Sequence, residues 1–532
     1  MGQVYVDENS LSSIGNALRN ITNTTNNFYP NQMGPTIENI STGLEITDTR
    51  YLFKDGARTY NLDEFNSIVN SIKNNATIKN TSEMFFNCDL HTENGIVPNF
   101  DTSAVYDMNY MFSNISNHNY NYIIPNFNTS NVIYMAGIFS SSTLFLDFSQ
   151  VDNWDISKVN TMNNAFAMYS WKDPNPNIQV KLPNWNFSGV RYFENFLRGV
   201  RSRNYCDFNS IDISGASSVN FMFSGCNAFS NISNITDSSI SNYLGADEMF
   251  SNCVTDEIKD IDLHRANGCR NLFRNSIVNR ISNINLCNIK STYNMSQAFL
   301  TNSNSNLSIL NIDLSNIDSS YQIFYGISAL KDISDINLVN VTNSTSMFAY
   351  CHNLINVENL YIEKTLSCYS MFNDCTNLIS ISNFNTYMTT NMVNMFFNCN
   401  NLTNVPNFDT SNVTNMVNMF SNCYSLTEVP NFDTGKVINM SRMFYCCFNL
   451  IDVPQFNTSE TNDMLRTFIS CNNLSNESIQ NIINMCLNSN VTNSVQMNLS
   501  NSNSYSPLAD TKFNNSYYQD RWQELTDAGW KY

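Results

Sequence analysis

The stretch of sequence that decides the fold is residues 392–468, which read MVNMFFNCNNLTNVPNFDTSNVTNMVNMFSNCYSLTEVPNFDTGKVINMSRMFYCCFNLIDVPQFNTSETNDMLRTF. In and just before it, one phenylalanine recurs every 24 residues, at Phe372, Phe396, Phe420, Phe444 and Phe468. Cysteine follows three positions later and leucine six positions later, at Cys375, Cys399, Cys423, Cys447, Cys471, Leu378, Leu402, Leu426, Leu450 and Leu474. A fixed period of about 20–50 residues indicates stacked units, because one unit cannot bury its apolar face alone. We predict that these side chains form the inner columns of a solenoid.

The same register continues towards the N-terminus with looser spacing. The corresponding phenylalanines there are Phe85, Phe112, Phe139, Phe166, Phe196, Phe223, Phe250, Phe273, Phe299, Phe324 and Phe348. With the five regular positions they make sixteen coils. In each coil we expect L-x-x-V-P-x-F to be a short parallel strand. We expect D-T-S-x-V-x-x-M-x-x-M-F to be a return that opens on a Thr or Ser cap and makes a helical turn or two. The prolines lack an N–H and should lie at strand ends.

The repeat pattern M-F-x-x-C-x-x-L-x-x-V-P-x-F-D-T-S-x-V-x-x-M closely resembles the BspA-like leucine-rich repeats of bacterial surface and phage proteins, a repeat of the Mycoplasma and Lactobacillus surface-protein type. The resemblance covers roughly residues 81–475. It implies an α/β repeat solenoid of leucine-rich-repeat-like coils, with short parallel strands and helical or irregular returns. Such scaffolds host many binding roles, so the resemblance alone does not name a ligand.

The composition disfavours two kinds of partner. The chain of 532 residues has 45 acidic and 27 basic side chains and a net charge of −18, which is unsuited to the phosphate backbone of a nucleic acid. No apolar run of about 18 residues occurs, so we expect no membrane insertion.

The N-terminal sequence MGQVYVDENS lacks the basic and apolar segments of a signal peptide, and the C-terminal sequence has no hydrophobic sorting tail.

The fifteen cysteines follow the repeat and do not suggest a disulfide framework. One repeat position holds nine of them: Cys88, Cys226, Cys253, Cys351, Cys375, Cys399, Cys423, Cys447 and Cys471. Stacked side chains that point in one direction have poor geometry for a disulfide, and a buried free cysteine behaves as a small apolar residue. We predict a column of free thiols in the core.

We predict four regions along the chain. Residues 1–45 form a helical attachment segment, 46–80 the N-terminal cap, 81–475 the solenoid and 476–532 a C-terminal capping region. A cap is needed because the end coils would otherwise expose their inner faces to water. The apolar residues at helical spacing in the two end regions are Leu11, Ile14, Leu18, Ile21, Ile479, Ile482, Ile483 and Cys486. Ser475 or Asn476 is the expected N-cap of the C-terminal helix.

Both ends of the chain resemble phage proteins. The segment SLSSIGNALRNITNTTNNFYPNQMGPTIENI resembles the N-terminal element of many phage tail proteins, and the end RWQELTDAGW resembles the tails of phage-encoded repeat proteins. The first resemblance is carried by Ile14, Ala17, Leu18, Arg19, Phe28, Pro30 and Ile37. It implies attachment to other virion tail or baseplate proteins through the N-terminal segment.

A candidate ligand-binding surface lies at the insertion that begins after Phe166. Insertions in a solenoid form surface loops, often on the binding face. Exposed aromatic rings suit sugar rings, and arginines suit the anionic groups of a glycan. The predicted ligand-binding residues are Tyr169, Trp171, Trp185, Arg191, Arg198, Arg201 and Arg203. The alternative is that the tryptophans belong to the core and the arginines are merely solvated.

No motif in the sequence indicates catalysis. The four histidines have no Ser or Cys partner in a known arrangement, and the sequence contains no GxSxG, HExxH, P-loop or dinucleotide-binding fingerprint. We therefore expect a non-enzymatic protein with no cofactor and no metal site.

The main functional hypothesis is a phage virion component, a tail fibre or receptor-binding protein that is assembled in the host cytoplasm. Its partner would be a glycan or protein receptor on the host cell surface. The alternative is a BspA-like adhesin on a bacterial cell surface. A third hypothesis, a glycan depolymerase, lacks a supporting motif. No residue pattern marks a trimer interface, so a homo-oligomer stays an open alternative.

Overall fold

The computed structural model describes residues 78–87, 97, 99–115, 123–142, 151–169, 182–239, 243–266, 268–289, 298–299, 307–491, 521, 523–525 and 527–528, with the backbone alone at 202–206. The contacts divide the chain into unit 1, Met1–Thr255, and unit 2, Asp256–Tyr532, which are described separately. The predicted attachment segment 1–45 lies outside the described residues, as does the predicted N-terminal cap except for residues 78–80.

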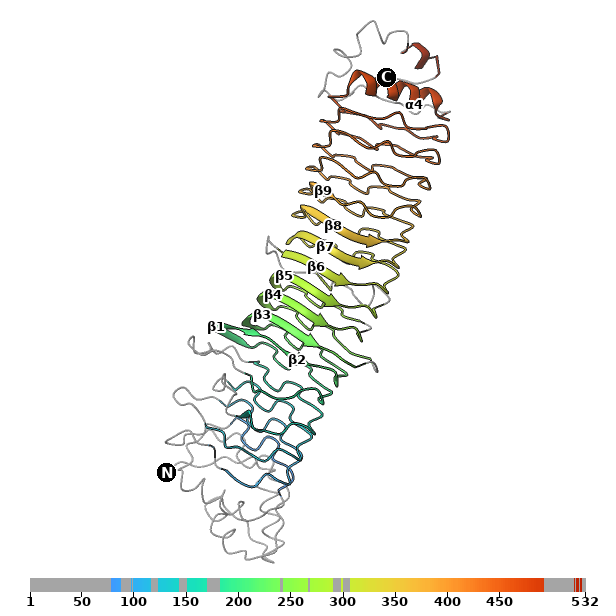
Figure 1. Ribbon diagram of the computed structural model, residues 1–532. Coiled ribbons are helices and arrows are strands. Elements are labelled where there is room, and N and C mark those ends of the chain that lie inside the picture. Colours follow the sequence, from blue (N-terminus) through green and yellow to red (C-terminus); the bar gives the residue numbers. More distant parts are fainter. Residues whose placement is uncertain are drawn as a thin grey trace, which may run out of the picture. The chain divides into compact units, whose positions relative to one another are not determined.

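Each unit is a stack of coils joined by parallel pairing, so the predicted repeat solenoid is confirmed. In unit 2 the strands β5 (Ile277–Asn285), β6 (Leu307–Asp313), β7 (Leu330–Leu338), β8 (Asn356–Ile362) and β9 (Ser380–Ile381) pair in parallel in sequence order (Figure 1). The strand β4 (Val254–Asp262), most of which belongs to unit 2, neighbours β5.

Unit 1 shows the same stacking with fewer strands. Its strands β1 (Arg201–Phe208) and β2 (Ile211–Asp212) both pair in parallel with β3 (Asn227–Thr236). Single parallel bridges join the coils on the return side of this unit, through Asn80, Asp107, Tyr134, Thr161, Tyr192, Ser218 and Gly245.

The strands turn apolar side chains inward three residues apart where a left-handed residue lies between them. In β7, Ile333 and Ile336 are buried, whereas Ser334 and Asp335 between them both face outward. Asp335 has a left-handed backbone with φ of 57°. A left-handed residue in a strand bends the strand and interrupts the usual alternation of faces, as in a β-bulge. This explains why Ile333 and Ile336 are three residues apart, whereas Ile336 and Leu338 keep the usual spacing of two.

Proline ends the regular sheet beyond β9. The amide of Ser382 donates to the carbonyl of Val357 at 2.9 Å. Pro406 occupies the same position in the next coil, and it has no N–H to repeat this bond. The inward pattern nevertheless continues, because Val405 and Phe408 are 8% and 3% exposed.

The return segments are tight turns rather than the predicted helical turns. Phe396 donates its N–H to Met419 of the next coil at 2.9 Å, whereas the next amide, Phe397, donates to Asn394 in its own coil at 3.1 Å. Asn394 and Asn398 have φ of 56° and 60°. A right-handed helix cannot contain such residues, so the helical prediction is wrong for these segments. Asparagine tolerates this backbone better than most residues, which accounts for part of its abundance.

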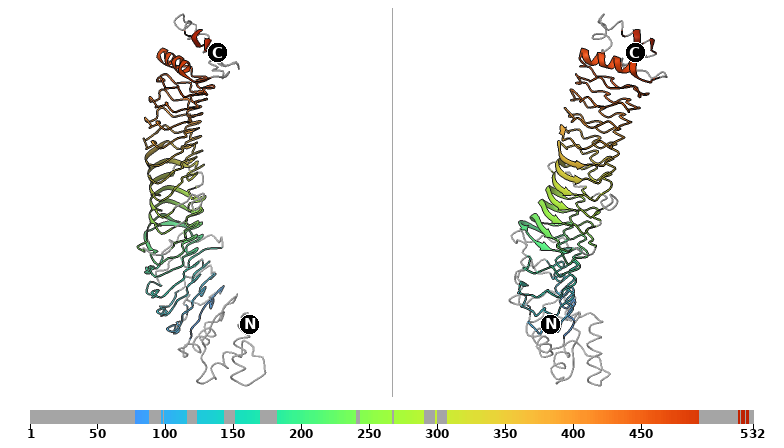
Figure 2. Two further views of the ribbon diagram at one scale, coloured as in Figure 1. Left: turned by 90° about the vertical axis from the view of Figure 1, so that its right-hand side faces the viewer. Right: turned by 45° about the vertical axis from the view of Figure 1, so that its right-hand side comes forward.

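The strands and the return segments lie on different sides of the coils (Figure 2). The side chains of the predicted columns are buried between them. The phenylalanine rings stack nearly parallel, with centroid distances of 5.4 Å for Phe372–Phe396, 5.5 Å for Phe396–Phe420 and 5.6 Å for Phe420–Phe444. All twelve predicted core residues are 0% exposed: Phe372, Cys375, Leu378, Phe396, Cys399, Leu402, Phe420, Cys423, Leu426, Phe444, Cys447 and Leu450.

One coil of unit 1 departs from the predicted register. Phe166 donates its N–H to Phe196, and Leu197 donates to Met222. In the other coils, the N–H of the column phenylalanine donates to the carbonyl of the residue that immediately precedes the column phenylalanine of the next coil, as Phe396 does to Met419. The column position therefore belongs to Leu197, and Phe196 precedes it. The ring of Phe196 stands at 90° to that of Phe166, so the parallel stack is interrupted here.

The thiol column is free, as predicted, among the thirteen cysteines that the structure describes. Each thiol in the regular coils donates to the carbonyl of the phenylalanine in the preceding coil, as Cys399 does to Phe372 and Cys423 to Phe396, both at 3.1 Å. The thiol thus pairs its weak donor with a backbone acceptor instead of burying it unpaired.

A helix covers the last coil. The helix α4 (Asn476–Asn488) begins at the N-cap Ser475, whose side chain accepts the N–H of Ser478. The predicted apolar face is buried, and Asn481 donates to the carbonyl of Val453 at 2.9 Å. These contacts seal the inner face of the last coil in unit 2 (Figure 1).

Candidate functional site

The structure separates the predicted ligand-binding residues into different environments. Trp185 is 7% exposed, stacks on Trp154 at 6.0 Å and donates its Nε1–H to Val151 at 2.8 Å. It belongs to the core, as the alternative interpretation held, because its indole N–H and its ring find partners inside unit 1, the ring with Trp154, Phe166 and Phe187. Trp171 and the side chain of Arg203 lie outside the described residues.

Two predicted residues meet on the return side of unit 1. Tyr169 is 52% exposed and donates its hydroxyl to Asn164. The exposed Arg198 donates from Nη1 to Asn195 at 2.9 Å, and its guanidinium lies 5.3 Å from the ring centre of Phe221. Partial burial raises the pKa of Tyr169, while the positive charge of Arg198 acts to lower it. We call Tyr169, Asn164, Arg198, Asn195 and Phe221 the Tyr169–Arg198 surface.

The other two described arginines do not join this surface. Arg191 is exposed at a different repeat position, where its N–H donates to the carbonyl of Asn160 at 3.0 Å. Arg201 opens β1 and is half-buried. Sequence reasoning found Tyr169 and Arg198, but it could not tell which of the arginines would stand beside the tyrosine.

Tyr110 places a further aromatic ring beside the Tyr169–Arg198 surface, because residue 137 is a glycine. Gly137 has φ of 60°, and a Cβ built on it would lie 2.1 Å from the ring of Tyr110. Asn164, Asn195 and Phe221 hold the same repeat position in later coils. The absence of a side chain at Gly137 therefore lets Tyr110 lie flat across the coils beside this surface.

Gly137→Ala should destabilise unit 1 more than Gly326→Ala destabilises unit 2. Both glycines are left-handed, which costs an alanine about 1–2 kcal/mol. Only Gly137 also displaces a ring, whereas a Cβ on Gly326 would meet nothing within 4 Å. Overpacking of this kind adds about 1–3 kcal/mol. Denaturant unfolding of each variant measures the difference, and equal losses would contradict the placement of Tyr110.

The turn side of unit 2 carries further exposed aromatic pairs. Tyr325 and Tyr350 are 40% and 39% exposed, with ring centres 5.3 Å apart. Tyr424 and Phe448 are each 38% exposed and stack at 5.1 Å. Coil stacking produces these pairs, because their members come from neighbouring coils and contact each other only across the stack.

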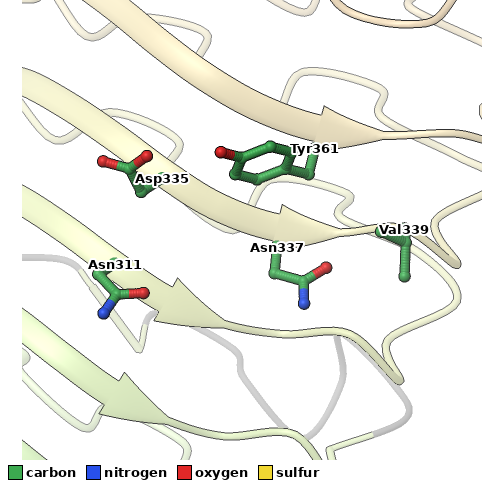
Figure 3. A pocket seen from close by; sticks show the side chains of 5 residues that line it. All are labelled: Asn311, Asp335, Asn337, Val339 and Tyr361. Carbon is green, nitrogen blue, oxygen red and sulfur yellow. The ribbon is translucent and has the colours of Figure 1, made fainter.

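The strand side of unit 2 contains a pocket of about 610 Å³ that the sequence did not indicate. It is lined by Asn311 of β6, Asp335 and Asn337 of β7, Val339 just beyond β7, and Tyr361 of β8. Figure 3 shows the carboxylate of Asp335, the hydroxyl of Tyr361 and the two amide groups around it. These residues belong to no motif, and only the pairing of three strands brings them together.

The described histidines have structural partners. His264 lies 2.9 Å from Asp262 through Nδ1, and His352 lies 3.0 Å from the carbonyl of Asp374. In the part of the chain that the structure describes, no group of three His, Cys, Asp or Glu side chains is placed to hold a metal ion. Among the same residues, no helix is long and apolar enough to cross a membrane.

The sequence matches the family model described as "Mycoplasma protein of unknown function, DUF285" over residues 47–178, 145–262, 246–360 and 366–482. Similar solved structures include a leucine-rich repeat protein from Eubacterium ventriosum, at 16% identity over 53% of this chain and 82% of that chain, with a TM-score of 0.25. Another is a leucine-rich repeat protein from Bacteroides ovatus, at 15% identity over 64% of this chain and 81% of that chain, with a TM-score of 0.26. The comparison with curated proteins gave no match.

Proposed function

We propose that this chain, which belongs to the DUF285 family of Mycoplasma proteins of unknown function, is a non-enzymatic binding protein that recognises a glycan or a protein on a cell surface. The observation that carries the proposal is the Tyr169–Arg198 surface. Tyr169 is 52% exposed and Arg198 is exposed, and neither side chain fills the inner columns that hold the coils together. Their chemistry is therefore available to a ligand.

The ligand that suits this surface combines a ring or other flat apolar face with an anionic group. An exposed tyrosine offers an apolar face together with a hydroxyl. A guanidinium donates two parallel N–H bonds to a carboxylate, sulfate or phosphate. An acidic glycan has both features. The net charge of −18 would repel an anionic ligand elsewhere on the protein, so Arg198 would have to supply a local attraction.

We place this binding role on a bacterial cell surface, as in the adhesin alternative. The family is described for Mycoplasma proteins, and this description contains nothing of a phage tail. The virion hypothesis rested on the resemblances of the two ends, on the repeat scaffold and on the expected lack of an export signal, and residues 1–45 lie outside the described residues. Antibody labelling of intact bacterial cells, compared with labelling of purified phage particles, separates the two locations.

Tyr169→Ala and Arg198→Ala should each weaken binding by about five- to hundredfold, since a charge-assisted contact or an aromatic contact contributes roughly 1–3 kcal/mol. Binding of the full chain to intact cells and to immobilised acidic glycans measures the effect. Arg191→Ala is the matched control, because it removes an exposed arginine at another repeat position. The effect of Arg198→Ala should shrink as salt concentration rises. Equal binding by all three variants would refute a role for this surface.

A further inference from the structure

The outward side of the sheet in unit 2 carries a ladder of amide hydrogen bonds. Each of the strands β4 to β8 has one left-handed residue there, namely Asp260, Asn283, Asn311, Asp335 and Asn359. Asn283 donates through Nδ2 to Asp260 at 2.6 Å, and Asn311 donates in the same way to Asn283 at 2.8 Å. Each amide thus donates to the residue in the preceding strand.

The ladder is interrupted at Asp335. Asn359 donates to Asp335 at 2.9 Å, but a carboxylate has no N–H with which to donate onward to Asn311. No hydrogen bond joins Asp335 to Asn311 in the described part of the sheet, and the Oδ1 of Asn311 receives no donor there. Asp335 accepts from Asn359 through Oδ1 and from Ser334 through Oδ2, whereas the amide oxygen of Asn311 beside it receives no donor from the next strand.

The pocket described above opens at this interruption. Besides Asn311 and Asp335 it is lined by Asn337, whose Oδ1 is buried and has no hydrogen-bond partner. Tyr361, at 51% exposed, forms one wall with its ring (Figure 3). Buried acceptors are nearly always paired in folded proteins. The unpaired Oδ1 of Asn337, beside the exposed amide oxygen of Asn311 that receives no donor from the sheet, therefore points to a ligand that brings its own donors.

We propose that this pocket binds one sugar ring of a surface glycan. The hydroxyl groups of the sugar would donate to Asn311, Asp335 and Asn337, and the C–H face of the ring would lie against Tyr361. A pocket of about 610 Å³ falls within the range of about 300–1,000 Å³ for small-molecule sites. The site belongs to unit 2 and does not use the Tyr169–Arg198 surface, so this proposal goes beyond the proposed function and can fail without it.

The donor set favours a sugar over a bound cation. Asp335 is the one carboxylate in the lining, and the other acceptors are neutral amides. A single carboxylate provides too few oxygen ligands for a calcium-type site, which takes 6–8. Several neutral acceptors beside an exposed aromatic ring suit many hydroxyl groups and one apolar face, which is the pattern of a pyranose.

The test is binding of methyl glycosides of glucose, galactose, mannose and N-acetylglucosamine to the full-length protein, measured by saturation-transfer NMR and calorimetry. We expect at least one glycoside to bind. Asn337→Leu removes an acceptor at constant size, and Tyr361→Ala removes an exposed ring, so each should weaken binding at least tenfold. Asp260→Asn is the matched control, because it changes the same ladder position in β4 outside the pocket, and it should leave binding unchanged.

Three outcomes would overturn the proposal. The first is that none of the four glycosides binds, and the second is that binding survives both Asn337→Leu and Tyr361→Ala. The third is that tetramethylammonium competes with the glycoside at equal concentration, which would identify a cation site. Loss of glycoside binding in the Tyr361→Ala variant together with intact cell binding would separate this site from the Tyr169–Arg198 surface. Circular dichroism and the melting temperature verify that each variant is folded.

Discussion

Phe420→Ala is expected to lower the free energy of unfolding of unit 2 by about 3–5 kcal/mol. Phe420 is 0% exposed, and its ring lies between those of Phe396 and Phe444 at 5.5 and 5.6 Å. The substitution removes the transfer free energy of the ring and leaves a cavity. Two neighbouring rings also lose a stacking partner. In a solenoid, each coil contacts only its neighbours, so the stack cannot redistribute this loss over a larger core.

The matched control is Phe448→Ala. Phe448 is also a phenylalanine of unit 2 stacked on another ring, but it is 38% exposed and lies on the turn side. Its removal should cost less than that of Phe420, because the partly exposed ring leaves no closed cavity and its pair contributes only about 0.5–1.5 kcal/mol beyond buried area. Denaturant titration followed by circular dichroism compares the two variants. Similar losses would mean that the phenylalanine column is not the core.

The second large effect is a loss of stability at alkaline pH. Burial raises the pKa of the Cys351 and Cys368 thiols to about 12. An unfolded chain holds a thiol pKa of about 8.5. Because the folded pKa is the higher one, the folded state keeps protons that the unfolded state releases. The contribution of these two protonated thiols to the free energy of unfolding is therefore fully present below about pH 8.5 and is lost as pH rises towards 12.

Each such thiol lowers the free energy of unfolding by about 1.4 kcal/mol per pH unit between the unfolded and the folded pKa. The Cys351 and Cys368 thiols together should cost on the order of 5 kcal/mol between pH 9 and 11. Burial also raises the pKa of Cys375, Cys399 and Cys447 well above its ordinary value, so these thiols act in the same direction. Urea unfolding under reducing conditions, measured from pH 8 to 11, gives the slope of the unfolding free energy against pH.

The Cys351→Ser and Cys368→Ser double variant tests the cause of that slope. Serine does not titrate in this range, and its hydroxyl can still donate to the carbonyl of Phe324 as the Cys351 thiol does at 2.9 Å. The slope of the unfolding free energy against pH should fall by the equivalent of about two protons, whatever stability the variant has at pH 7. An unchanged slope would show that Cys351 and Cys368 do not cause the alkaline loss.

The inner columns were predictable because the repeat displays them directly. Phe396, Cys399 and Leu402 keep the same offsets in every regular coil, and side chains that recur at one offset must face one direction in a stack. The prediction failed at Phe196, where an insertion moved the register by one residue and a leucine, not a phenylalanine, holds the column position. Only the inter-coil hydrogen bond of Leu197 revealed this shift.

The return segments could not be predicted because their local pattern suits two structures. Apolar residues three and four apart, such as Met392, Met395 and Phe396, are compatible with a helical turn. The chain instead donates alternate N–H groups to the next coil, and it becomes left-handed at Asn394 and Asn398. A backbone that must pair with a neighbour at every coil favours turns over a helix, which would keep its hydrogen bonds to itself.

The candidate surfaces depended on tertiary structure in the same way. Tyr169 and Arg198 are 29 residues apart and meet because their coils are neighbours. Trp185, chosen for the same reason as Tyr169, faces inward, since it occupies the column of Trp154. The sequence by itself determined the inside of this protein, because one coil repeats the spacing of the next. Only the tertiary structure decided the outside, because the surface and the pocket join side chains from neighbouring coils that share no repeated pattern.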